Sequence, residues 1–130
     1  MNLVICNYPT YRMVTHMNDI VSCQPLREPT FFILLCLSPG PRHGYAILKE
    51  VTLLSEGRVK LSTGTLYGAI KRLLGRGWIR HVDNPMPNCT GRERKSYELT
   101  ESGRSALNAE IARLRKLVIV AQTRIAEETS

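Results

Sequence analysis

The sequence predicts an α+β fold that is mostly helical, with three helices, a β-hairpin and a long terminal helix. Three observations lead to this prediction. Residues 61–79 combine an apolar stripe at helical spacing with small and cationic residues. Two strand-like segments then flank a turn-rich stretch, and an apolar seam with steps of four and three follows them. The chain of 130 residues is long enough for one domain with a modest core.

Two helices are predicted before the central stretch. Residues 1–24 show no clear period and are expected to be a mobile or loosely packed extension. An apolar helix is predicted from Glu28 to Leu37, because the sequence SPGP at 38–41 is a strong break. A second helix is predicted from about His43 to Leu54, ended by residues 55–57. Five of its residues are expected on or near the buried side: Tyr45, Ile47, Leu48, Val51 and Leu54.

The third helix lies within residues 61–79. Its apolar stripe, typical of a helix buried on one side, consists of Leu66, Ile70, Leu73 and Leu74. The opposite side carries only small or cationic residues: Gly64, Thr65, Gly68, Lys71 and Arg72. Ser62 or Thr65 can cap the start of the helix, and the pair Gly75 and Gly77 can end it. The opposite face is either an ordinary solvated face or one that closely approaches a polyanion such as DNA.

A β-hairpin is predicted after this helix. Trp78 to Val82 reads as a strand, residues 83–91 as a turn with two prolines, and residues 92–99 as the returning strand. On the return, Lys95, Tyr97 and Leu99 share one face of the strand. Three helices followed by a basic hairpin is the order of a winged helix-turn-helix.

A terminal helix is predicted from Glu101 to about Ala126, with Thr100 as its cap. Its apolar seam has steps of 4, 3, 4, 3 and 4 and consists of Leu107, Ile111, Leu114, Val118, Ala121 and Ile125. A helix this apolar must be covered by its own domain or by a second copy of the chain. We favour the second copy and expect a homodimer. The predicted division is therefore 1–24 extension, 25–100 winged-helix domain, and 101–130 dimerisation helix and tail.

Charge is concentrated in one part of the chain. Residues 58–95 hold nine Lys or Arg against Asp83 and Glu93, which accounts for the whole net charge of +7. This distribution favours a polyanionic partner, double-stranded DNA, that contacts the third helix and the hairpin.

Other classes of function lack a pattern to support them. The cysteines at 6, 23, 36 and 89 have no paired spacing, so no metal or other cofactor is expected. Cys36 is expected in the core. No catalytic constellation is evident, so the chain is not expected to be an enzyme. No signal peptide or membrane-spanning segment is evident, and a reduced, cytoplasmic location is expected.

Three blocks of the sequence, HGYAILKEV, STGTLYGAIKRLLGRGWI and RKSYELTESGRSAL, occur in this order. In order and spacing the chain resembles the PadR family of bacterial transcriptional regulators over about residues 28–125. The resemblance implies a dimeric winged-helix DNA-binding protein, usually a repressor relieved by a small-molecule effector. It further implies that the third helix enters the major groove, that the wing reaches the backbone or minor groove, and that the terminal helix dimerises. Many members have Pro where this chain has Gly68, which leaves the start of the third helix open.

The candidate DNA-binding residues come from the resemblance and from the face opposite the apolar stripe. They are Tyr45, Thr63, Gly64, Thr65, Tyr67, Gly68, Lys71, Arg72, Arg92, Arg94 and Lys95. For Tyr45 a structural role is favoured, whereas Tyr67 is either a core ring or a phosphate donor. Trp78 is expected to fill the junction between helix and strand.

Two functions remain open. The first is a sequence-specific repressor that binds a two-fold operator as a dimer. The second is a winged-helix module that docks a protein partner through its terminal helix. The coincidence of the basic segment with the third helix and the hairpin favours the first.

Overall fold

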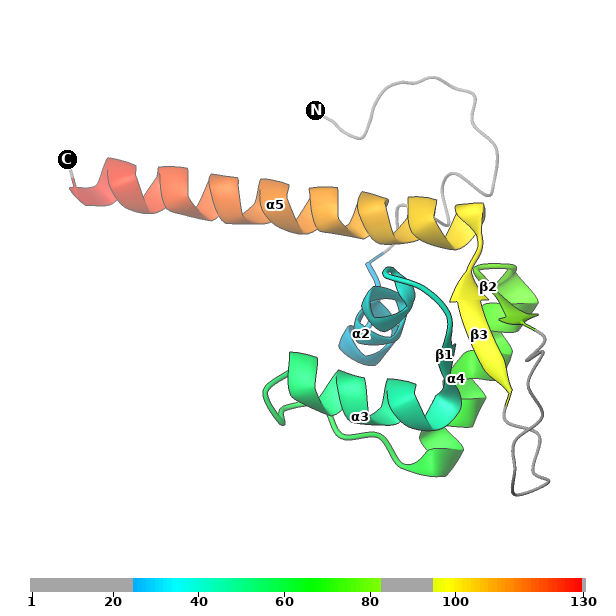
Figure 1. Cartoon of the computed structure of the whole chain (residues 1–130). Helices are drawn as coiled ribbons and strands as arrows, with labels where there is room; N and C mark the ends of the chain where they lie inside the picture. The colour runs from blue at the N-terminus through cyan, green and yellow to red at the C-terminus, as the bar shows by residue number, and fades with distance from the viewer. Residues whose placement is uncertain (1–24, 83–94, 130) are drawn as a thin grey trace.

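The computed structural model describes residues 25–82 and 95–129. Within these residues a small domain lies beneath one long helix (Figure 1). The elements in chain order are α2 (Glu28–Leu37), β1 (Arg42–His43), α3 (Gly44–Leu54), α4 (Thr63–Arg76), β2 (Ile79–Val82), β3 (Ser96–Leu99) and α5 (Glu101–Thr129). The predicted mostly helical α+β architecture is therefore confirmed. The predictions for residues 1–24 and 83–94 lie outside the described residues.

The core forms around α2, which lies between α3 on one side and α5 on the other (Figure 1). This placement explains why α2 has no polar face, since neighbours cover it from two directions. Its Ile33, Leu34 and Leu37 are almost fully buried. The thiol of Cys36 is buried as predicted, and burial raises its pKa to about 12, which keeps it protonated and unreactive at neutral pH.

The sheet has three antiparallel strands in the order β1-β3-β2. The alternation predicted for the returning strand is confirmed for Tyr97 and Leu99, which are buried. Lys95, expected on the same face, lies before β3 and is exposed. Strand β1 was not predicted, and its two residues are too few to show an alternation. Because His43 pairs with Ser96 in this strand, the second helix begins at Gly44 and not at His43.

A network of main-chain contacts joins α4, β2 and α5. Gly77 ends α4 in the left-handed conformation, with φ of 75°. Trp78 is buried as expected, although the strand begins one residue later than predicted. The Thr100 hydroxyl donates to the Gly77 carbonyl at 2.6 Å and accepts from the Gly103 N–H at 3.0 Å, which makes Thr100 the cap of α5.

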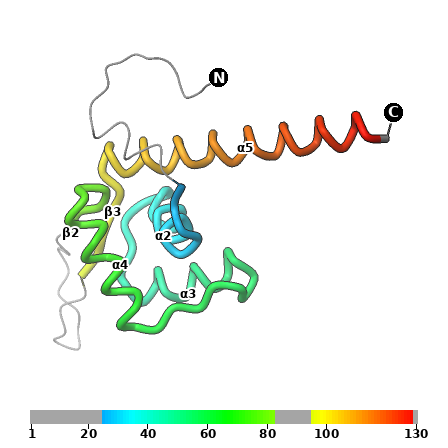
Figure 2. The backbone as a smooth tube through the Cα atoms, turned by 180° about the vertical axis from the view of Figure 1, so that it is seen from behind, coloured from blue at the N-terminus to red at the C-terminus, as the bar shows by residue number. Residues whose placement is uncertain are grey.

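Helix α5 is divided into two parts that differ in burial. Its first turns contribute Ala106 and Leu107 to the core. Glu110 is buried there beside Arg113 at 2.6 Å, and hydrogen bonds from this guanidinium lower the pKa of its carboxyl group. Beyond Arg113 every described side chain of α5 is exposed, and the helix extends past the domain (Figure 2). None of the described helices is both long enough and apolar enough to cross a membrane.

Candidate nucleic-acid interface

Helices α3 and α4 form a helix-turn-helix whose turn is held by local hydrogen bonds. The Ser55 hydroxyl accepts from the N–H of Val59 at 2.9 Å, and Glu56 and Gly57 both have positive φ. Ser62 caps α4, because its hydroxyl accepts from the N–H of Thr65 at 3.1 Å. Of the two predicted caps, Ser62 is therefore the one used.

The buried side of α4 agrees with the predicted stripe. Leu66, Ile70 and Leu73 are buried, whereas Leu74 is only partly buried. Ala69 is also buried and was not predicted, because a small residue adds little to an apolar pattern. The stripe fixes which face of α4 remains outside the domain.

The outer face of α4 is exposed as predicted. Thr63, Gly64, Thr65, Lys71 and Arg72 are exposed, and Gly68 is partly exposed. The first turn has no acidic residue. Within the described part of the chain, neither Lys71 nor Arg72 forms an ion pair. Their charges are thus available to an anion.

In the basic segment, residues 58–95, some of the cations already have a partner within the chain. Arg58 pairs with Glu28 at 2.7 Å, and Arg80 pairs with Glu98 across strands β2 and β3. The Arg76 guanidinium lies 4.8 Å from the centre of the Trp78 ring. Among the residues that the structure describes, the basic segment leaves five exposed cations without an ion pair: Lys60, Lys71, Arg72, Arg76 and Lys95.

Tyr45 is placed differently from the prediction. It was expected on or near the buried side of its helix, but 64% of its surface is exposed, and Leu54 is exposed as well. Ile47 and Val51 fill the contact with the core, which leaves Tyr45 on the outer side of α3. The ammonium of Lys49 lies 5.5 Å from the centre of its ring. Sequence reasoning missed Lys49, although a spacing of four residues on a helix places it beside Tyr45.

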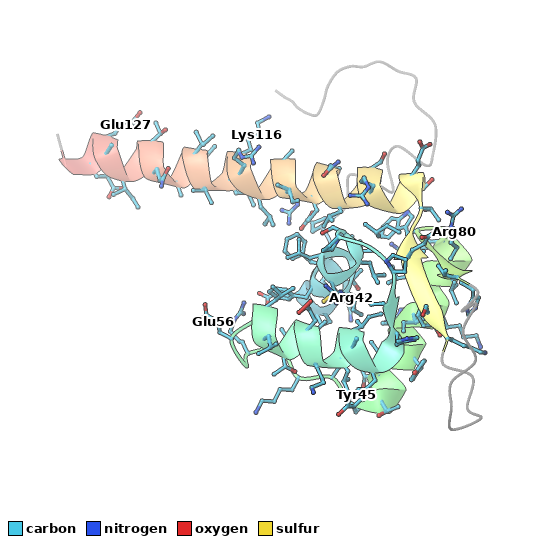
Figure 3. All side chains as sticks on the ribbon, viewed as in Figure 1. Arg42, Tyr45, Glu56, Arg80, Lys116 and Glu127 are labelled. Carbon is cyan, nitrogen blue, oxygen red and sulfur yellow. The ribbon has the colours of Figure 1, made fainter. Side chains whose placement is uncertain are left out.

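Tyr45 and the start of α4 lie at the same end of the domain. Figure 3 shows Tyr45 at the lower edge, on the side opposite α5. The first turn of α4 and the beginning of β3 point to this side in both views (Figures 1 and 2). Lys95, directly before β3, is exposed. Arg92 and Arg94 lie outside the described residues. Tyr45, the first turn of α4 and the beginning of β3 therefore lie on the face opposite the long helix.

Gly68 lies inside α4 and not in its first turn. A helix that began late, near Thr65, would place Gly68 in a tolerant first turn. The helix begins at Thr63, so a late start does not explain the glycine. A Cβ atom on Gly68 would lie 3.8 Å from Arg72 Nη1, an ordinary van der Waals distance. No contact among the described residues therefore requires a glycine here. Close approach of the helix to DNA stays a prediction.

We expect the Gly68→Ala variant to be more stable but to bind DNA more weakly. Alanine should add about 0.5–1 kcal/mol to the free energy of unfolding, because glycine costs that much in a helix interior. Its methyl group should also hold the helix backbone away from a groove. Thermal melts and binding titrations of both proteins measure the two effects. Unchanged or tighter DNA binding would contradict the close-approach explanation.

Comparisons with known proteins support the same family as the sequence motifs. The model of the transcriptional regulator PadR-like family matches residues 33–109. A protein of 37.1 kDa in transposon TN4556 of Streptomyces fradiae is 35% identical over 90 residues, which cover 69% of this chain. The match spans 24% of that protein, so the chain corresponds to about a quarter of its length.

Solved structures resemble this fold closely. A PadR family regulator from Clostridium difficile R20291 superposes with a TM-score of 0.63 at 25% identity, covering 76% of this chain and 99% of that one. A PadR-like transcription factor from Bacteroides fragilis gives 0.60 at 26%, covering 72% and 86%. Bacillus subtilis PadR, solved in complex with operator DNA, gives 0.55 at 26%, covering 63% and 45%. With the family model matching more than half of its residues, this winged-helix chain belongs to the PadR-like family of transcriptional regulators.

Proposed function

We propose that the protein is a sequence-specific DNA-binding regulator that reads the major groove with the outer face of α4. The observation that carries this proposal is the exposed face of α4, on which small residues surround Lys71 and Arg72. Within residues 25–82 and 95–129 no carboxylate pairs with these two cations. Such a face brings the helix backbone close to base edges while its cations reach phosphates. The complex of Bacillus subtilis PadR with operator DNA supports this role.

The other candidate residues take supporting roles in this proposal. Tyr45 and Lys49 lie on α3, the helix that crosses the DNA backbone in helix-turn-helix proteins. Lys95, together with Arg92 and Arg94, contacts phosphates from the wing. These contacts position the protein on the duplex, and α4 supplies the sequence preference.

The proposed regulator is a dimer held by the exposed part of α5. Leu114 is 37% exposed and Val118 is 52% exposed, which is more apolar surface than a long solvent-facing helix usually carries. Leu107, by contrast, is 3% exposed inside its own core and offers no surface to a partner. The interface therefore begins near Ile111. Two-fold pairing of this part of α5 would present two α4 helices to half-sites about 34–36 Å apart, or a multiple of that.

Repression, and its relief by a small-molecule effector, are further parts of this proposal. They rest on the resemblance to the PadR family.

The alternative is a winged-helix module that docks a protein partner through α5. One observation favours it. Leu117, Ile119 and Val120 are each more than half exposed, so the apolar surface extends beyond one heptad seam. DNA binding distinguishes the two functions, because the alternative needs none.

Binding to DNA should depend steeply on salt. A duplex enriched by the wild-type protein from a random-sequence pool is titrated by fluorescence anisotropy at several salt concentrations. If a dimer neutralises about six to ten phosphates, affinity should fall ~10³–10⁵-fold between about 50 and 200 mM salt. Replacing Arg94 and Lys95 by alanine should lower the slope and largely preserve sequence preference.

A matched pair of variants tests the assignment to α4. Lys71→Ala with Arg72→Ala removes two unpaired cations, whereas Arg58→Ala with Arg80→Ala removes two cations that already have carboxylate partners. The first pair should weaken binding far more than the second, although both change the net charge equally. A flat salt response, or no enrichment of any duplex, would favour the protein-docking alternative.

A further inference from the structure

Gly44 and Tyr67 meet where α3 and α4 cross. Gly44 is the first residue of α3 and is buried, and Tyr67 reaches it from the second turn of α4. A Cβ atom on Gly44 would lie 2.5 Å from the Tyr67 Oη and 3.0 Å from its Cζ. Real Cβ atoms essentially never show the first distance, and the second is tighter than most real Cβ contacts. The tyrosine ring can therefore occupy its position only because residue 44 has no side chain.

The same corner of the domain holds the strands that lead to the hairpin. The rings of Tyr97 in β3 and His81 in β2 lie 5.1 Å apart. Burial, and to a lesser extent the Tyr67 phenol, raise the pKa of Tyr97. His43, directly before Gly44, pairs with Ser96 of β3, and its Nδ1 lies 2.9 Å from the Ser96 hydroxyl. Tyr67 thus lies at the junction of α3, α4 and the sheet.

We propose that Tyr67, seated on Gly44, is a positioning residue that sets the orientation of α4 relative to the sheet and its hairpin. This inference rests on the proposed function, since the orientation matters only if both elements contact one duplex. At its C-terminal end α4 is tied to the domain through Gly77 and Trp78. Near its N-terminal end the ties include Leu61 packed against the core, the buried Leu66 and the contact between Tyr67 and Gly44. Specific binding needs the N-terminal end held in place, because those residues reach the bases.

The Gly44→Ala variant tests this positioning role in a protein that should still fold. The atom that obstructs a Cβ is the far end of a side chain that is 45% exposed, so the ring can move while the backbone stays in place. The melting temperature should change little. Affinity for the selected duplex should fall about tenfold, the loss expected when one specific base contact is misplaced. Affinity for a shuffled duplex should stay the same, because phosphate contacts carry no sequence information.

A double-mutant cycle tests the proposal. The full chain, Gly44→Ala, Tyr67→Ala, the double variant and Tyr67→Phe are titrated with the selected and the shuffled duplex, and each is melted. Tyr67→Ala should lose discrimination, and adding Gly44→Ala to it should have no further effect because the obstructing ring is gone. Tyr67→Phe keeps the ring and should retain the discrimination that alanine loses. Gly75→Ala is the control, because a Cβ there has nothing within 4 Å.

Each other outcome overturns the proposal. Wild-type discrimination in Gly44→Ala would show that the contact does not orient α4. An equal loss in Tyr67→Phe and Tyr67→Ala would assign the tyrosine hydroxyl a direct contact with DNA. Additive losses, or unfolding caused by Gly44→Ala in both backgrounds, would show that Gly44 acts on something other than Tyr67. If the wild-type protein itself does not distinguish the two duplexes, the proposed function fails, and this inference fails with it.

Discussion

Replacing Gly103 by alanine should destabilise the protein more than the same replacement at any other described glycine. A Cβ atom at this position would lie 2.0 Å from the Trp78 carbonyl oxygen and 2.8 Å from its carbonyl carbon. These are backbone atoms, and the same carbonyl oxygen accepts a hydrogen bond from the N–H of Thr100 at 3.0 Å. The start of α5 must therefore move away from the sheet. We expect a loss of about 3 kcal/mol or more, at the upper end of overpacking effects.

Urea denaturation followed by circular dichroism measures this loss. Gly75→Ala is the matched control, because it adds the same methyl group inside a helix where nothing lies within 4 Å. The control should gain about 0.5–1 kcal/mol from helix propensity. If Gly103→Ala unfolds at the same urea concentration as the wild type, the close contact with Trp78 is not part of the native fold.

A charge introduced at Leu114 should dissociate the dimer that we propose. Leu114 is the first clearly exposed residue of the seam, so glutamate should fit on an isolated chain without disturbing the core. In a dimer the same carboxylate would be buried without a partner, at a cost of about 3–5 kcal/mol. Sedimentation should show a folded monomer, and the tight binding that depends on two α4 helices should be lost.

The control for this variant is Ala112→Glu. Ala112 is exposed on the same helix but lies outside the predicted seam, and a glutamate there has Lys116 four residues later. This variant should remain a dimer. If Leu114→Glu and the wild-type protein sediment with the same mass, then α5 does not dimerise through this seam.

Interactions between residues close in sequence could be predicted from the sequence alone. The extent of α4 follows from the Ser62 cap and from Gly77 in the left-handed conformation, both of which act within one helical turn. The buried stripe of α4 and the alternation of Tyr97 and Leu99 follow from the period of a helix and of a strand. The order of these elements was sufficient to predict the winged-helix fold.

Contacts between distant parts of the chain could be decided only by the tertiary structure. The two residues of β1 become a strand because β3, more than 50 positions later, supplies their partners. Tyr45 is exposed because Ile47 and Val51 already fill the contact with the core. The seam of α5 appears uniform in the sequence, yet its first part is core and its second part is surface. Periodicity shows that a face is apolar, but what covers that face depends on where the domain ends.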